Sequence, residues 1–490
     1  MKRIVILLAS VALLAMPAAA HAAIINVDKT DDTLELGDSG CSLRNAFISA
    51  DTDMQQAECE IGIGDDVIRM AAGTYRLDRL GAGESQGFIG DLDMLDEASI
   101  TIEPASASAK VVIDGNGADR IFDHAASDLG ALILRNIELT NGNPGAAADG
   151  GLIRNGNGVV RLEGVTLSGG VSGNGGAVQV LGSGRLEAVN STFFGNRTQG
   201  NGGAIANDSG TTVDLRSVTI AGNEADVDGN GTGDGGGVMF KGNAAMTNSI
   251  LANNTDSSPN PGERQNDCAS GAQFLPRFVL SSQDLSAGSC LTGPDPGSNM
   301  DPVALGPTVL ADNGGPTRTV EIQPGSPAVD TAGSSDPDKC PEKDQRGVPR
   351  PAGKCDLGAF EFDPEGVPPV PLPGLRAPSL STAVFDGTRV SMLVKCPARF
   401  KPQCSSKLQV LKSKQGKAIS TAAEVKIKPG KTRVVKVTVK SQFRSLVDGM
   451  TYVDKRSLAV SHQISSKKVG KRKTRKPTKL KLSLKVRIAG

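Results

Sequence analysis

Residues 226–234 have the side chains and the spacing of a calcium-binding loop. Asp226, Asp228 and Asn230 alternate along the segment and a glycine follows, as in the motif D-x-[DN]-x-[DN]-G. The motif's twelfth position, normally a bidentate glutamate, is Gly237 here. The segment is therefore no EF-hand, and a polar surface insertion is the alternative to weak calcium binding. The predicted calcium ligands are Asp226, Asp228, Asn230 and Asp234.

A basic segment near the C terminus could bind an anionic polysaccharide or cell-envelope polymer. From Gly366 to the end the chain has 29 Lys and Arg against 4 Asp and Glu, and the remainder has 24 against 49. The alternatives are a solvated basic face, or docking on the acidic body of the same chain. Aromatic residues that could stack on bases are scarce, so sequence-specific nucleic-acid binding is not expected. The predicted contacts are Lys467, Lys468, Lys471, Arg472, Lys473, Arg475 and Lys476.

Residues that could cleave a polysaccharide are few. A lyase would need calcium-bound carboxylates and a basic side chain, and a hydrolase would need two converging carboxylates. Glu187 and Asp214 could be neighbours, but Arg161 beside Glu187 favours an outward ladder of charges. His124 has no G-H-G context and is interpreted as structural, and the chain has no Trp to stack on sugars. We assign no catalytic residue and favour a non-catalytic protein, with a polysaccharide lyase or glycoside hydrolase as the alternative.

A repeat must position these residues. Five eleven-residue segments align without a gap, and their starts are 28, 26, 27 and 31 residues apart. Their eighth column is always large and apolar, whereas the fifth and eleventh hold Asn, Gly or Ser, which accept the left-handed backbone of a turn. A second element, GGLI, GGAV, GGAI or GGGV, recurs between them. The segments begin at Leu132, Val160, Leu186, Val213 and Ala244.

Short strands and glycine or asparagine turns at this period predict a solenoid. We expect an all-β protein: a right-handed parallel β-helix with three strands per coil, followed by a small antiparallel β-sandwich. On the order of nine coils would fit between residues 66 and 310. Some jellyroll and propeller folds share this period, but the repeats of propeller blades usually carry aromatic signatures, and aromatic residues are scarce in this chain.

CSLRNAFISADTD, which begins at Cys41, predicts a short helix that covers the open end of the solenoid. Its apolar residues fall at i, i+3, i+4 and i+7, and Ser42 stands where an N-cap would lie. An uncovered end exposes an apolar core and an unpaired strand edge, so repeat proteins need caps. Leu43 and Phe47 are expected to pack on the first coil.

The N-terminal residues predict export. A charged start, a short apolar run and a small-residue end form a signal peptide with cleavage between Ala22 and Ala23. No later segment reaches the ~20 apolar residues of a membrane span. We therefore expect an extracellular or cell-surface protein without a transmembrane segment. An even number of cysteines in an exported chain favours disulfides, and sequential pairing is expected because the cysteines fall into local pairs. The pairs are Cys41–Cys59, Cys268–Cys290, Cys340–Cys355 and Cys396–Cys404.

Several motifs resemble one class of secreted bacterial β-helix proteins. CSLRNAFISA resembles the CSLREA-type N-terminal domain, with Asn45 in place of the acidic residue that would complete a capping box with Ser42. GGAV, GGAI and FFGN resemble the repeats of polymorphic outer-membrane proteins, which are surface adhesins. The segment from Asn299 with DQRGVPRPAGKCDLGAFEF resembles the choice-of-anchor Q segment. The resemblance implies a right-handed parallel β-helix on or outside the cell, and no single activity.

The C-terminal part predicts a separate two-faced sheet. In KLKLSLKVRI the apolar residues Leu480–Ile488 alternate with basic ones, and VVKVTVK from Val434 has the same pattern. We expect a secreted adhesive protein that is a monomer and needs no cofactor other than a possible calcium ion. The expected parts are a signal peptide 1–22, an N-terminal cap 23–65, the β-helix 66–310, a C-terminal cap 311–362, a Pro-rich linker 363–378 and a basic β-sandwich-like domain 379–490.

Overall fold

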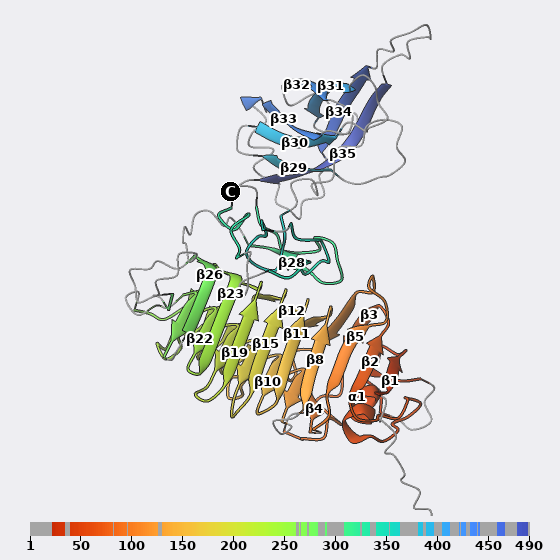
Figure 1. The fold of residues 1–490 in the computed structure, drawn as a ribbon, viewed down its shortest axis with the longest axis vertical. Helices are drawn as coiled ribbons and strands as arrows, with labels where there is room; N and C mark the ends of the chain where they lie inside the picture. The colour runs from red at the N-terminus through yellow and green to blue at the C-terminus, as the bar shows by residue number, and fades with distance from the viewer. Residues whose placement is uncertain are drawn as a thin grey trace, which may run out of the picture. The chain divides into compact units, whose positions relative to one another are not determined.

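The computed structural model shows an all-β chain built on a parallel β-solenoid (Figure 1). The chain divides into two compact units. The first contains the solenoid and most residues up to Glu361, and the second contains Phe362–Gly490 with the short segments Val303–Pro307 and Ile322–Ser326. The structure describes residues 22–34, 40–81, 83–95, 97–125, 130–260, 264, 266–271, 274–282, 290–291, 308–323, 326–333, 340–351, 353–362, 381–385, 389–395, 404–411, 421, 423–427, 432–438, 440–441, 458–465 and 478–488.

Parallel sheets form the walls of the solenoid, and each strand pairs with its counterpart in the next coil. The first wall contains β1 (Ile24–Val27), β2 (Asp66–Met70), β5 (Ile100–Pro104), β8 (Ala131–Arg135), β11 (Val159–Glu163), β15 (Arg185–Val189), β19 (Thr212–Arg216), β23 (Asn243–Ala252) and β26 (Phe274–Ser281). The second contains β3 (Gly73–Arg76), β6 (Val111–Asp114), β9 (Glu138–Thr140), β12 (Thr166–Ser168), β16 (Thr192–Phe194) and β20 (Thr219–Ala221), and it also ends on β23.

The third wall, which we call the seven-stranded wall, closes each coil. It contains β4 (Leu92–Met94), β7 (Phe122–His124), β10 (Ile153–Asn155), β14 (Val178–Val180), β18 (Ile205–Asn207), β22 (Val238–Phe240) and β25 (Cys268–Ser270). A short four-stranded sheet lies at one corner and contains β13 (Val171–Ser172), β17 (Arg197–Thr198), β21 (Glu224–Ala225) and β24 (Thr255–Asp256). The solenoid therefore has about seven turns, fewer than the nine expected from the repeat period.

The strand register confirms the alignment of the five repeats. Leu132, Val160 and Leu186 pair across successive coils, and the large apolar residues of the eighth column stack in the same way. The fifth column adopts positive φ, at Asn136 (53°) and Ser217 (52°) for example, as predicted. The prediction for the eleventh column is wrong, because the tenth column takes the left-handed backbone instead.

The eleventh column forms a ladder of buried asparagines inside the solenoid. The Oδ1 atom of Asn223 accepts from both nitrogens of Asn196 at 2.9 Å, and Asn254 accepts from Asn223 in the same way. Asp267 ends the ladder by accepting from Asn254. Each amide group satisfies backbone groups that would otherwise be buried without a partner, which explains why these asparagines lie in the core.

Helix α1 (Leu43–Thr52) covers the first coil as predicted, with Phe47 completely buried against Phe122. Ser42 is the N-cap, and its Oγ accepts from the Asn45 backbone nitrogen at 3.2 Å. The reciprocal bond of a capping box does not form, since Asn45 Oδ1 has no hydrogen-bond partner. An amphipathic helix exposes one face, but here residues 87–95 also contact α1, and its outer residue Arg44 is buried.

Three of the four predicted disulfides are confirmed. They are Cys41–Cys59, Cys268–Cys290 and Cys340–Cys355. Cys396 lies outside the described residues, so its pairing with Cys404 stays a prediction. Within the described part of the chain no helix has the length and apolar character that a membrane span requires.

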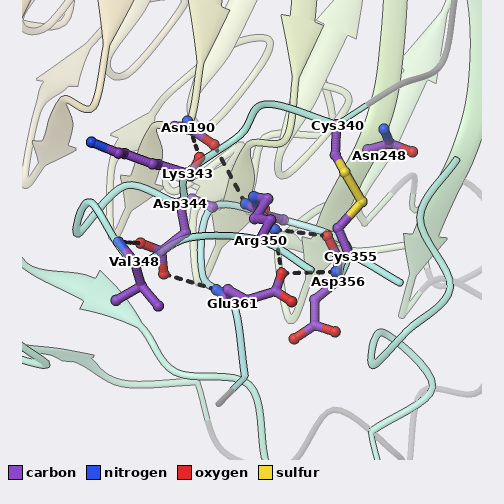
Figure 2. A network of polar contacts seen from close by, with 12 residues as sticks. Asn190, Asn248, Cys340, Lys343, Asp344, Val348, Arg350, Cys355, Asp356 and Glu361 are labelled. Carbon is purple, nitrogen blue, oxygen red and sulfur yellow. Dashed lines mark hydrogen bonds and ion pairs between the residues drawn. A yellow bond between two sulfur atoms is a disulfide. The ribbon is translucent and has the colours of Figure 1, made fainter. Parts of the chain in front are cut away.

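The described residues within 308–321 and 327–361, here called the flanking segment, lie along the side of the solenoid over the second wall. Gln345 Oε1 accepts from Thr192 Oγ1 at 2.6 Å, and Ala359 N donates to Thr219 Oγ1 at 3.0 Å. Figure 2 shows how Asn190 meets this segment, where its Nδ2 donates to the Lys343 carbonyl oxygen at 2.8 Å. The segment includes β27 (Leu310–Ala311) and β28 (Thr319–Val320), which pair antiparallel.

A buried ion pair holds the flanking segment together. Arg350 donates to Glu361 Oε2 at 2.8 Å, and both side chains are at least 97% buried. Asp344 accepts from the backbone nitrogens of Val348 and Glu361 (Figure 2). The polar residues of DQRG and of DLGAFEF are thus used in packing. The smaller number of turns has another cause: the register partners Asp66, Ile100 and Leu132 are 34 and 32 residues apart, so the first coils are longer than the repeat period.

The C-terminal unit contains one seven-stranded sheet. Its strand order is β32-β31-β34-β35-β29-β30-β33, and all neighbours pair antiparallel except β29 and β35. The strands are β29 (Ser381–Phe385), β30 (Arg389–Lys395), β31 (Cys404–Leu411), β32 (Ala423–Ile427), β33 (Thr432–Thr438), β34 (Leu458–Ser465) and β35 (Thr478–Ile488). The strands expected at Val434 and in KLKLSLKVRI are therefore present, and the predicted linker 363–378 lies outside the described residues.

Candidate functional site

The seven-stranded wall carries a group of charged residues on its outer face. Its register pairs Asp93 with Asp123 and Asp123 with Arg154. Because neighbouring residues in a strand point to opposite faces, these three lie outside while Phe122 and its paired neighbours fill the core. Despite lying on the outer face, Asp93 and Asp123 are 96% and 92% buried. The charges therefore interact in an environment that excludes most water.

Three residues that precede strands, Asp91, Asp119 and Arg120, complete the cluster. We define the acidic cluster as Asp91, Asp93, Asp119 and Asp123 with Arg120 and Arg154. The Nη1 atom of Arg120 lies 3.2 Å from Asp91 Oδ2 and 2.8 Å from Asp123 Oδ2. The Nη1 atom of Arg154 lies 2.9 Å from both oxygens of Asp123. Asp123 thus binds two guanidinium groups, a pairing that offsets part of the cost of burying it.

The capping helix holds the loop that carries Asp91. Arg44 donates from Nε to Asp32 Oδ1 at 2.6 Å and from Nη2 to Asp32 Oδ2 at 3.0 Å. Its guanidinium group also donates to the carbonyl oxygens of Gly87, Gly90 and Asp91. Gly87 N in turn donates to Asp93 Oδ2 at 2.9 Å. Arg44, the arginine of the CSLR motif, therefore helps to position the acidic cluster from the helix that covers the first coil.

Burial changes the protonation of two of these carboxyl groups. Desolvation, reinforced by the charge of Asp119, raises the pKa of Asp91 to about 8, although Arg120 opposes the shift. Desolvation also raises the pKa of Asp93 to about 7, against the hydrogen bond from Gly87. Burial raises the pKa of Asp119 as well. At neutral pH Asp91 therefore holds a proton beside the ion-paired Asp123, an acid next to a carboxylate.

Asp91, Asp93 and Asp123 are also the one described group of carboxyls with metal-like spacing. Their nearest oxygens lie within 4.8 Å of one another. Oxygen ligands of this kind suit Ca²⁺ or Mg²⁺. The two guanidinium groups already bind Asp123, however, so a cation would have to compete with them. Three chemical roles are thus open to the cluster: proton transfer, cation binding and structural ion pairing.

The carboxyls of the predicted calcium loop are used differently. Both oxygens of Asp226, which is fully buried, accept backbone hydrogen bonds at 2.9 Å, from Asn230 N and Gly231 N. Asp228 accepts from the Asn230 side chain at 2.9 Å, and Asp234 N donates to Asn201. These bonds order the loop in the manner of Asx turns. Calcium binding by these residues stays a prediction.

The remaining residues that the sequence analysis considered for catalysis are Arg161, Glu187, Asp214 and His124. Arg161, Glu187 and Asp214 lie in register, and Arg161 Nε is 2.8 Å from Glu187 Oε2, which confirms an outward ladder of charges. His124 points into the solenoid core, where neither ring nitrogen has a hydrogen-bond partner among the residues that the structure describes. Burial lowers the pKa of His124, so its ring is neutral at physiological pH. These residues form no catalytic arrangement.

The sheet of the C-terminal unit separates basic from apolar residues. The register of the strands shows that the residues of one face are mostly polar. In the described strands, Glu424 is the acidic residue of that face. The opposite face is largely Leu, Val and Ile, as in Leu480, Leu482 and Leu484. The basic residues of this basic face are Arg389, Lys395, Lys407, Lys426, Lys436, Lys479, Lys481, Lys485 and Arg487.

Sequence reasoning missed the acidic cluster. The five aligned repeats start at Leu132, and the acidic cluster is mostly built from residues before that position. A signal was present: LDM at Leu92 and FDH at Phe122 each place an aspartate between two apolar or buried positions, 30 residues apart. The predicted basic contacts at 467–476, from Lys467 to Lys476, lie outside the described residues.

Comparison of the chain with models of known families, with characterised proteins and with solved structures finds no match. The fold is therefore assigned from the strand pairing alone, and function must be argued from the two charged sites.

Proposed function

We propose that this protein is a secreted or cell-surface structural and adhesive β-helix protein whose C-terminal sheet binds an anionic polysaccharide or envelope polymer without cleaving it. The observation that supports the proposal is the basic face, where nine Lys and Arg share one side of a sheet with Glu424. Like charges gathered on one face repel one another and attract polyanions over a Debye length of about 8 Å at physiological salt. The basic segment 467–476 adds to this charge.

We also propose the handedness of the solenoid, the class of secreted proteins to which the chain belongs, the fold of the C-terminal unit and the oligomeric state. We propose that the solenoid is right-handed, since crossovers between parallel strands almost always are. The motifs CSLR and DQRG support a place among secreted proteins with CSLREA-type and choice-of-anchor Q segments. We further propose that the C-terminal sheet folds as a small sandwich and that the chain acts as a monomer.

Polymer binding is tested with the exported chain that begins at Ala23. Its affinity for polygalacturonate, an anionic polymer, is compared with its affinity for neutral dextran. Lys479→Gln, Lys481→Gln and Lys485→Gln together should weaken polygalacturonate binding about tenfold or more. The matched control removes three arginines from the outer face of the solenoid, Arg69, Arg135 and Arg161, which are half-exposed partners of glutamates. Equal losses in both triples would contradict the proposal.

We also propose that residues 226–234 bind a calcium ion. Asp226 and Asp228 would supply carboxylate oxygens, with Asn230 and Asp234 as further ligands. Calorimetric titration with Ca²⁺ tests it, and Asp228→Asn should weaken binding while Asp208→Asn, a matched change outside the loop, should not. Equal binding in the two variants would remove the site.

The acidic cluster supports a second candidate function, an extracellular glycoside hydrolase. A hydrolase pairs a protonated carboxyl with an ionised one, and the raised pKa of Asp91 beside Asp123 supplies such a pair. New reducing ends are counted on a panel of acidic and neutral polysaccharides. Loss of cleavage in Asp91→Asn would support this candidate, and no cleavage of any polymer would remove it.

A further inference from the structure

The predicted processing site lies against a buried carboxyl group. Ala23 precedes β1, and its backbone nitrogen donates to Asp66 Oδ1 at 2.9 Å. Its carbonyl oxygen accepts from Val67 N, also at 2.9 Å, so pairing of β1 with β2 holds Ala23 in place. Ala22, on the other side of the peptide bond, is exposed. Cleavage between these two alanines would leave the new terminus touching Asp66.

Asp66 lies where a negative charge is unfavourable in the uncut chain. Its surface is 99% buried, and the charged groups that face it are the carboxylates of Asp53 and Asp65. Burial, reinforced by these like charges, raises the pKa of Asp66 despite hydrogen bonds from Ile63 N and Ala23 N. A cation at the position of the Ala23 nitrogen would favour the ionised form of Asp66 and so lower its pKa.

We propose that removal of the signal peptide creates such a cation, and that the α-ammonium group of Ala23 forms a partly buried ion pair with Asp66 that stabilises the first coil. Hydrolysis breaks the Ala22–Ala23 peptide bond, and water gives its hydroxyl to the Ala22 carbonyl carbon and a proton to the Ala23 nitrogen. The free amine then takes up a second proton, because an α-amino group has a pKa of about 7.7–8.0. The neutral donor becomes a charged one, and a charge-assisted bond is roughly twice as strong.

The ion pair predicts a pH dependence with a definite sign. Asp66 of β2 accepts from the amine, Asp53 and Asp65 of the preceding loop lie close enough to affect the charge of Asp66, and Glu60 binds Asn26 of β1. All four are acidic, so they raise the pKa of the α-ammonium group in the folded protein. Its contribution to stability is complete below the unfolded value of about 8 and is lost as the pH rises through the folded value.

The first experiment determines the N-terminal sequence of the exported protein. The expected first residue is Ala23. Any other first residue refutes the proposal, because a longer terminus keeps an amide nitrogen at Asp66 and a shorter one removes the contact. This result does not depend on whether the protein binds a polymer.

The second experiment measures the thermal midpoint of three chains: one that begins at Ala23, the same chain acetylated on its α-amino group, and one that begins at Ala22. The free Ala23 chain should unfold about 2–4 °C higher at pH 7. Asp66→Asn should abolish this difference, whereas Asp65→Asn, a change in an exposed neighbour that makes no hydrogen bond to the amine, should reduce it much less. Equal midpoints for the three chains, or a difference that survives Asp66→Asn, would overturn the proposal.

A third measurement remains valid if Asp66→Asn fails to fold. The α-amino group of Ala23 is labelled with ¹⁵N and titrated by NMR in the full exported chain. The expected pKa is about one unit or more above the ordinary 7.7–8.0, which is a tenfold preference for the charged form. An ordinary pKa would show that the terminus makes no such ion pair.

Discussion

The buried arginine of the N-terminal cap offers the sharpest test of how the first coil is held. Arg44 is 100% buried, donates twice to Asp32 and satisfies three carbonyl groups from residues 87–91. Arg44→Met removes the charge and keeps most of the volume. Breaking a buried pair from one side costs about 3–5 kcal/mol, because the partner charge stays buried. We expect a loss in this range for the first coil.

Tyrosine fluorescence can report on this coil alone. The chain has no Trp, and Tyr75 and Tyr452 are its two tyrosines. Tyr75 lies buried in β3, so in a Tyr452→Phe background the signal follows the first coil. Urea unfolding by this signal gives the change in free energy without assuming that the whole chain unfolds in one step.

The control and the double variant make the result decisive. Arg161→Met breaks an exposed pair with Glu187 and should cost less than about 1 kcal/mol. Adding Asp32→Asn to Arg44→Met removes the unpaired charge, so the double variant should be more stable than the sum of the two single losses predicts. A loss below about 1 kcal/mol for Arg44→Met, or simple additivity, would refute the reasoning.

Further predictions concern the ladder, the flanking segment and the acidic cluster. Asn223→Ala leaves buried amide and backbone groups without partners and should cost about 2–4 kcal/mol in urea unfolding. Gln345→Ala removes the bond to Thr192 and should speed proteolysis within the flanking segment while cleavage in the coils stays unchanged. Because the folded pKa of Asp91 is raised to about 8, its stabilising contribution is complete below about pH 4 and declines as the pH rises to 8, by up to about 1.4 kcal/mol per unit. Asp91→Asn should therefore flatten the stability profile between pH 4 and 8, and an unchanged slope would contradict the raised pKa.

The strand stacking could be predicted from sequence because each coil repeats the same physical constraint. Large apolar residues such as Leu139, Leu167 and Phe193 must stack inside, so their spacing determines the register. The left-handed turn at Asn136 was predictable for the same reason. The role of an asparagine next to a glycine could not be predicted, because such an asparagine can occupy a turn or can satisfy buried backbone groups. Asn196 satisfies buried backbone groups.

The two candidate sites differ in how well they could be predicted from the sequence. The alternation around Lys481 and Lys485 predicted a basic face, and strand pairing extends that face to residues far apart in sequence, such as Lys407 and Lys436. The acidic cluster depends on contacts between turns, such as Arg120 with Asp91, that no local pattern encodes. Its burial also depends on the loop held by Arg44, a contact between residues more than forty positions apart.

The central claim is that charge on one face of the C-terminal sheet binds the polymer. The most direct test is the affinity of the exported chain for polygalacturonate as a function of salt concentration. The logarithm of the affinity should fall linearly with the logarithm of salt, and its slope should decrease by about one for each lysine removed among Lys479, Lys481 and Lys485. A slope unchanged by these substitutions, or an affinity independent of salt, would contradict the account.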